Sequence, residues 1–154
     1  MKFPFLCLAF LFLTATPAIV SAAPSKPDLG QPMNRLSLTA TEKLLRSMGV
    51  IFEEIEHGAF SVEMGGYRVV FYNHFDSVQL YAGFSGYTGV SNRTINKWNR
   101  EKRFSRAYLD DAGDPCLEAD LLVRGGVTQE NLKQFLDTFK ISLKAFSEAL
   151  DAGK

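Results

Sequence analysis

Cysteine is scarce in this chain of 154 residues, which contains only Cys7 and Cys116. Cys7 lies in an apolar N-terminal stretch that we expect to be removed, so Cys116 is left without an intramolecular disulfide partner. A domain of this kind has to be stabilised by its hydrophobic core. Such cysteine usage fits an exported bacterial protein in the periplasm better than a disulfide-rich extracellular module.

The chain also lacks an excess of either charge, with 17 basic (Lys and Arg) and 17 acidic (Asp and Glu) residues. This balance argues against general binding to nucleic acid, which needs a strongly basic surface. The two histidines, His57 and His74, lack the paired spacing of metal motifs. The phosphate-loop pattern G-x-x-x-x-G-K-[ST] is missing. We therefore expect no nucleic-acid partner, no metal and no cofactor.

The N-terminus has the organisation of a secretory signal peptide. One basic residue, Lys2, precedes the apolar run 3–15, and small residues up to Ala22 provide a signal-peptidase site. We expect cleavage after Ala22 and a periplasmic or secreted protein. The alternative is an uncleaved anchor, but the run is shorter than the roughly 18 to 20 apolar residues of a span. The mature chain is then expected to have no membrane span.

Removal of residues 1–22 leaves 132 residues with a formal charge of −1, which is enough for one domain. Residues 23–35 contain three prolines and a glycine and are predicted to be a flexible leader. Residues 36–151 are the predicted folded domain.

The fold of this domain is predicted from the period of its apolar residues. Thr39 and Glu42 have the spacing of a capping box at the start of a first helix, and Ser91 and Thr128 are N-cap candidates for two later helices. Alternation with period two between turn signals indicates six strands, at residues 51–56, 60–64, 67–72, 77–85, 104–109 and 116–123. The order α-β-β-β-β-α-β-β-α predicts an α+β fold with a single antiparallel sheet and helices packed on one face.

The last two strands are predicted to form a hairpin around a three-residue loop, 111–113, with its glycine in the left-handed conformation. The register then pairs Arg106 with Glu118, Tyr108 with Cys116, and Phe104 with Asp120. Small and apolar residues lie on the opposite face and are expected in the core, namely Ala107, Leu117, Ala119 and Leu121. A slip by one residue would bury Arg106 and Glu118, which is costly. The polar and aromatic face is therefore expected to point away from the helices.

Four sequence blocks carry a resemblance to a known family. They are Trp98-Asn99 with Arg103-Phe104, Tyr108-Leu109-Asp110, Leu117-Glu118-Ala119-Asp120, and Gly125-Gly126-Val127-Thr128. In this order they match W-N-x-x-x-R-F, Y-x-D, L-E-x-D and G-G-V-T of the YbjN family of bacterial sensory transduction regulators, which the chain resembles over most of residues 36–150. That family is similar in fold to type III secretion chaperones. The resemblance implies a non-enzymatic regulatory or partner-binding role and supplies no catalytic residue. The export signal of this chain argues against a cytosolic or transcriptional target.

The leading hypothesis is an exported module that binds a protein partner through the outer face of the hairpin and the helix before it. The candidate contact residues are Trp98, Arg100, Phe104, Arg106, Tyr108, Glu118 and Asp120. Homodimerisation through an exposed sheet face or edge strand is compatible with this surface. Because exposed ion pairs contribute little, Arg106→Glu is expected to change stability by less than about 1 kcal/mol.

Several alternatives stay open for the same residues. Glu118 and Asp120 share a strand face at about 7 Å and could, with Cys116, form a small hydrolase or ligand-binding enzyme, provided that a pocket surrounds them. Trp98 is more commonly a helix anchor than a partner contact. A basic ridge of Arg93, Lys97 and Arg100 is more commonly a solvated face than a grip on an acidic partner or anionic head groups. A structural envelope protein without a dedicated partner is a further alternative.

Overall fold

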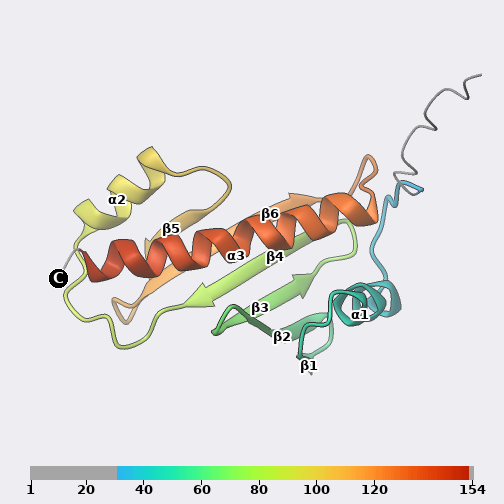
Figure 1. The fold of residues 1–154 in the computed structure, drawn as a ribbon, viewed down its shortest axis with the longest axis horizontal. Coiled ribbons are helices and arrows are strands. Elements are labelled where there is room, and N and C mark those ends of the chain that lie inside the picture. Colours follow the sequence, from blue (N-terminus) through green and yellow to red (C-terminus); the bar gives the residue numbers. More distant parts are fainter. Residues whose placement is uncertain (1–30, 153–154) are drawn as a thin grey trace, which may run out of the picture.

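The computed structural model describes residues 31–152, so the predicted signal peptide and most of the predicted leader lie outside the described residues. The elements are α1 (Leu38–Ser47), β1 (Phe52–Glu56), β2 (Ala59–Met64), β3 (Tyr67–Asn73), β4 (Ser77–Gly83), α2 (Asn92–Glu101), β5 (Arg106–Leu109), β6 (Pro115–Leu122) and α3 (Gln129–Asp151). Their order confirms the predicted succession of helices and strands (Figure 1).

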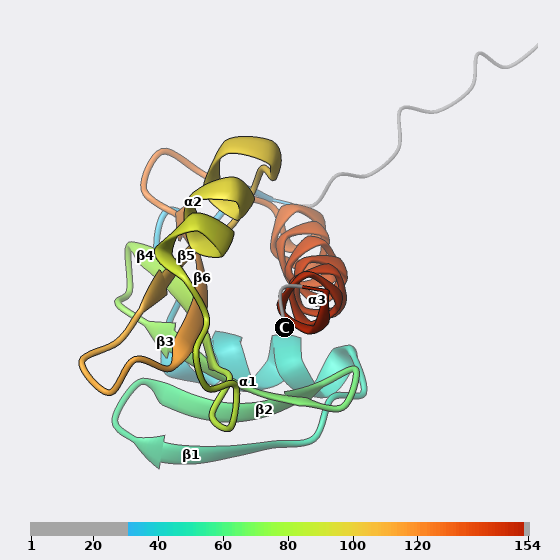
Figure 2. The ribbon, with the colours of Figure 1, turned by 90° about the vertical axis from the view of Figure 1, so that its left-hand side faces the viewer.

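The six strands form one antiparallel sheet in the order β1-β2-β3-β4-β6-β5. The sheet curves from β5 and β6 round to β1, and α1 and α3 lie on its inner side (Figure 2). The helix α2 packs against β5 and beside α3 at one edge of the sheet. This arrangement confirms the predicted α+β class. It leaves the outer face of the sheet without a helix among residues 31–152.

Each helix is preceded by an N-cap residue whose side chain accepts a hydrogen bond from a backbone amide of the first turn. The predicted caps Ser91 and Thr128 are confirmed for α2 and α3. The predicted capping box at Thr39 is wrong, because the cap of α1 is Ser37, whose hydroxyl accepts from the Ala40 amide at 3.2 Å. Thr39 therefore lies in the first turn of the helix, two residues after its cap.

The chain before α1 is paired to the rest of the domain. Met33 forms an isolated antiparallel bridge with Val127, with N–O distances of 2.7 and 3.0 Å. The neighbouring Gly126 has a φ of 102°, and a Cβ there would lie 3.2 Å from the Pro32 side chain. This turn therefore favours glycine both for its positive φ and for the close approach of residue 32.

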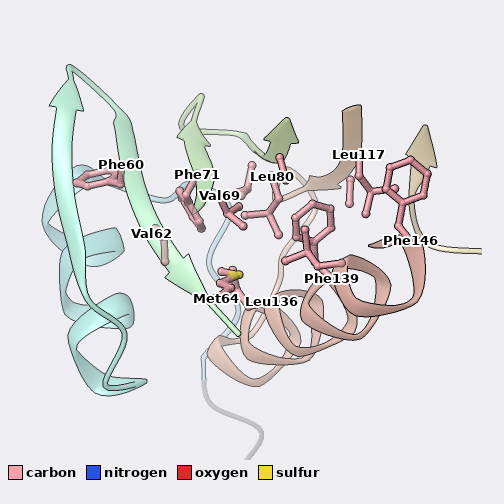
Figure 3. Close-up of a cluster of buried hydrophobic side chains, with 14 of the residues drawn as sticks. Phe60, Val62, Met64, Val69, Phe71, Leu80, Leu117, Leu136, Phe139 and Phe146 are labelled. Atoms are coloured by element: carbon pink, nitrogen blue, oxygen red, sulfur yellow. The ribbon is translucent and has the colours of Figure 1, made fainter. Parts of the chain in front are cut away.

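The core lies between the inner face of the sheet and α3, as Figure 3 shows. Alternate residues of the strands point inward, and the fully buried ones include Phe60, Val69, Phe71, Leu80 and Leu117. Burial of each such side chain stabilises the fold by roughly 1.5–3 kcal/mol. The apolar stripe of α3 supplies the facing layer, with Leu136, Phe139, Leu143 and Phe146.

Candidate partner-binding surface

The hairpin of β5 and β6 has the predicted register at two of its three predicted pairs. Arg106 lies opposite Glu118, and Tyr108 lies opposite Cys116. Residues 110–114 connect the strands, and the Asp110 amide donates to the Asp114 carbonyl at 3.0 Å across the predicted three-residue turn 111–113. Gly113 has a φ of 84°, as predicted. Ala107 and Leu117 are buried on the inner face. The polar face of the hairpin thus points away from the helices.

The third predicted pair, Phe104 with Asp120, is wrong. The strand β5 begins only at Arg106, and Phe104 adopts a φ of 69°, which is outside the extended region. A residue in the left-handed region turns the chain, so Phe104 leaves the sheet at this point. Alternation along the sequence cannot reveal such a break, because the residue type at position 104 favours a strand.

Glu118 is at the centre of a hydrogen-bonded cluster on the outer sheet face. Arg106 donates to its Oε2 from Nε at 2.9 Å and from Nη2 at 2.6 Å. Tyr108 donates to Oε1 at 2.6 Å. The side chain of Glu118 is only 9% exposed, whereas that of Arg106 is 64% exposed. Both carboxylate oxygens are therefore engaged beneath the guanidinium and the phenol ring.

Tyr81 of β4 belongs to the same cluster and was missed at the sequence level. It lies opposite Glu118 in the sheet, and its hydroxyl is 3.3 Å from Cys116 Sγ. A Cβ at Gly83 would lie 3.0 Å from this hydroxyl, so a glycine there lets the ring lie along its own strand. The alternation of β4 did place Tyr81 on the outer face. Its contact with Cys116 depends on the strand order, in which β6 lies between β4 and β5.

Four ionisable groups around Glu118 are held in their protonated forms. Burial and the hydrogen bond to Glu118 raise the pKa of Tyr108. The hydrogen bond with Cys116 and burial raise the pKa of Tyr81. Burial raises the pKa of the Cys116 thiol, and the hydrogen bonds to Glu118 raise that of Arg106. At neutral pH the cluster is thus a cation over a carboxylate, flanked by neutral phenols and a neutral thiol.

The raised tyrosine pKa values predict a loss of stability in alkali. A phenol whose pKa is higher in the folded state contributes stability that is present below its unfolded value of about 10 and is lost as pH rises towards the folded value. We expect the free energy of unfolding, measured by urea denaturation, to fall above about pH 10. The double variant Tyr81→Phe/Tyr108→Phe should fall less steeply. Equal slopes for the parent and the double variant would contradict the prediction.

The geometry does not favour the hydrolase alternative. Cys116 is buried as a neutral thiol, whereas a nucleophilic cysteine needs an accessible thiolate. Glu118 has both oxygens occupied, and Asp120 is exposed to solvent. None of the four best-formed hollows on the described surface is lined by any of these three residues. These hollows therefore give no support to a pocket around the three groups.

Trp98 and Asn99 attach α2 to the rest of the domain. Trp98 is 4% exposed, and its ring centroid lies 4.9 Å from that of Phe146 in α3. The Asn99 side chain donates to the Ala107 carbonyl and accepts from the Ala107 amide, both at 2.8 Å. These two bonds occupy backbone groups that β5, as an edge strand, would otherwise leave open. Asn99 was not among the predicted residues, because its role depends on β5 being at the edge.

Phe104 is an exposed aromatic residue in a strained conformation. Its side chain is 70% exposed, and its φ of 69° is unfavourable for any residue with a Cβ. The Arg103 guanidinium carbon lies 5.1 Å from its ring centroid. Beside it is a hollow of about 410 Å³ lined by Leu121 and Phe135, among others. Backbone strain combined with exposure is common where a residue serves recognition.

The structure therefore divides the seven predicted contact residues into three groups. Arg106, Tyr108, Glu118 and Asp120 share the outer sheet face, and Trp98 is in the core. Arg100 is exposed on α2, and Phe104 is exposed at a hollow lined by Leu121 and residues of α3. The candidate surface is the first group together with Phe104, two residues before Arg106 in the chain, and Trp98 acts as an anchor.

The fold and this surface define a small α+β domain with one uncovered sheet face and an arginine held on it by a buried carboxylate. The chain belongs to the YbjN family, whose description is "Putative bacterial sensory transduction regulator" and whose pattern matches residues 38–152. This description is regulatory and names no enzymatic activity.

A solved structure supports the same fold. The crystal structure of E. coli YbjN, described as "a putative transcription regulator", is similar to the chain with a TM-score of 0.60. The sequence identity is 18%, and the match covers 75% of this chain and 90% of that one, so the likeness shows the fold alone. A comparison with curated protein sequences gave no match. Within residues 31–152, no helix has both the length and the apolar character that crossing a membrane requires.

Proposed function

We propose that this chain is an exported, non-enzymatic module that binds a protein partner in the periplasm through the outer sheet face around Arg106 and the adjacent Phe104. The observation that carries the proposal is the cluster on the uncovered face, in which Glu118 fixes Arg106 and Tyr108 in place. The signal-like N-terminus supports export. The regulatory description of the family supports a binding role.

The cluster has the properties of a preorganised contact site. Arginine and tyrosine are enriched among residues that dominate binding energy at interfaces. Here both side chains are already held by hydrogen bonds, so less side-chain entropy is lost when a partner binds. The guanidinium still has a large exposed fraction, which leaves its remaining N–H groups available to acceptors of a partner.

The two edges of the sheet are less suited to symmetric pairing of strands. The edge at β5 is closed by Asn99, as described above. The other edge, β1, carries Glu53, Glu54 and Glu56 and has a bulge between the latter two. Like charges and a bulge discourage pairing between copies of a strand. The proposal therefore favours a different protein as the partner over an edge-to-edge homodimer.

The test is a substitution that removes an exposed contact without weakening the fold. Phe104→Gly removes the ring and relieves the positive φ, so the free energy of unfolding should stay within about 1 kcal/mol of the parent. Crosslinking in the intact periplasm, followed by mass spectrometry, should recover a specific partner with the parent and at least about fivefold less with the variant.

A matched control is available within the chain. Phe75 also has a positive φ, of 67°, and is 49% exposed, but it lies in the turn between β3 and β4. Phe75→Gly makes the same chemical change away from the candidate surface and should leave partner recovery unchanged. Equal recovery with the parent and Phe104→Gly, or no specific partner with the parent, would remove the basis of the proposal.

A further inference from the structure

A second surface feature lies between α2 and the C-terminal half of α3, which run beside each other in Figure 1. A hollow of about 500 Å³ opens between them. We call it the α2–α3 groove. Its apolar floor includes Trp98 and Phe146, and Ala145 and Ala149 form part of its α3 wall. Because these two wall residues are small, an approaching chain can come close to the α3 backbone.

The rim of the α2–α3 groove is basic. Arg93 and Lys97 line it from α2, and together with Arg100 they also line an adjoining hollow of about 680 Å³. These three side chains are exposed and occur at i, i+4 and i+7 of one helix. Glu101 and Glu148 contribute two acidic groups to the groove. Arg100 has its only described ion pair with the neighbouring Glu101, at 3.5 Å between exposed groups.

The buried floor of the groove contains a hydrogen-bond donor without a partner. Trp98 Nε1 is covered by other atoms and has no acceptor among residues 31–152. Leaving such a donor unpaired costs free energy, but because the atom is covered, a ligand on the groove surface does not reach it. The Lys102 Nζ lies 5.8 Å from the indole centroid and adds a further positive charge at this end of the groove.

We propose that the α2–α3 groove is the docking site for an acidic amphipathic helix of the partner protein. Its apolar face would pack on the half-buried Ala145 and Ala149, and its carboxylates would face the cations of α2. The three cations Arg93, Lys97 and Arg100 extend over roughly 10 Å along α2. This span exceeds a single anionic head group and matches acidic residues spaced i, i+4 and i+7 on a second helix. The inference rests on the proposed function, because it names the recognition element of the same partner.

The test uses purified protein and a synthetic helical peptide of about 18 residues that has glutamates at this spacing beside a leucine face and contains no tryptophan. Trp98 is the only tryptophan of the chain, so its fluorescence emission reports directly on the groove. We expect a saturable change in emission with the acidic peptide, weaker at high salt because the charges are exposed. A matched peptide with lysines in place of the glutamates should give no saturable change.

Two double variants distinguish the effect of charges at the groove from the effect of net charge. Lys97→Glu/Arg100→Glu should weaken the affinity for the acidic peptide by at least about tenfold. Lys43→Glu/Lys140→Glu makes the same change in net charge at exposed lysines of α1 and α3 outside the groove, and should keep the affinity within about twofold. Equal binding of both peptides, or equal affinities of the two variants, would overturn the docking site.

The nature of the ligand is tested with vesicles of phosphatidylglycerol and phosphatidylcholine. If these vesicles change the Trp98 emission, lose that effect in Lys97→Glu/Arg100→Glu, and the acidic peptide gives no change, the groove is a membrane contact and the helix assignment is wrong. A specific periplasmic partner that Lys97→Glu/Arg100→Glu still recovers would remove the groove inference and leave the proposed function intact. Peptide binding without any recovered partner would support the groove as a peptide site and remove the basis of the proposed function.

Discussion

Phe146→Ala is expected to lower the free energy of unfolding by about 3–5 kcal/mol, the usual range for a buried phenylalanine. Phe146 is fully buried, and its ring packs edge-on against two others, with centroid distances of 4.9 Å to Trp98 and 5.2 Å to Phe84. It therefore joins α3 to both α2 and the end of β4. Removal of the ring leaves a cavity that the small neighbours Ala145 and Ala149 cannot fill.

The measurement is urea denaturation followed by circular dichroism, with the emission of Trp98 as a second probe. Loss of the Phe146 ring exposes the indole, so the native emission should move to longer wavelength. Phe135→Ala is the matched control, because Phe135 is on the same helix but only partly buried beside the hollow at Phe104. The loss of unfolding free energy in Phe135→Ala should be less than half of that in Phe146→Ala. A Phe146→Ala effect no greater than that of Phe135→Ala would show that the ring cluster does not hold the helices together.

Arg106→Glu is expected to lower the free energy of unfolding by about 2–3 kcal/mol, more than the sequence-based expectation of less than about 1 kcal/mol. The difference arises from Glu118, which is nearly buried and has Arg106 as its cationic partner. Removing one member of a buried pair costs about 3–5 kcal/mol, and the value is reduced here because Arg106 itself is largely exposed. The new carboxylate would also face Glu118 across the strand pair.

The control for this prediction is Arg100→Glu, which makes the same change at an exposed arginine paired only with another exposed side chain. Its effect should be within about 0.5 kcal/mol. Arg106→Lys should be intermediate, because it keeps the charge and loses the two-point contact with Oε2. If Arg106→Glu and Arg100→Glu unfold at the same urea concentration, the cluster contributes nothing measurable. Because a loss of stability would obscure a loss of binding, Phe104→Gly is the better test of partner recognition.

Local sequence patterns predicted most of the fold, and the reasons are visible in particular elements. The period of the apolar residues placed both ends of all six strands to within two residues. The glycine of the 111–113 loop determined the hairpin register, because a three-residue loop with a left-handed glycine allows a defined pairing. The cap at Ser37 was missed because Thr39 and Glu42 have the same local spacing as a true capping box.

The sequence by itself determined the α+β order, the hairpin register and which side chains of β6 face away from the helices, because these depend on neighbours along the chain. The tertiary structure decided that Tyr81 joins Cys116, that Glu118 is buried under Arg106 and Tyr108, and that Asn99 closes the β5 edge. These contacts depend on β6 lying between β4 and β5. Strand order is set by the packing of the whole core, and no local period or turn signal encodes it.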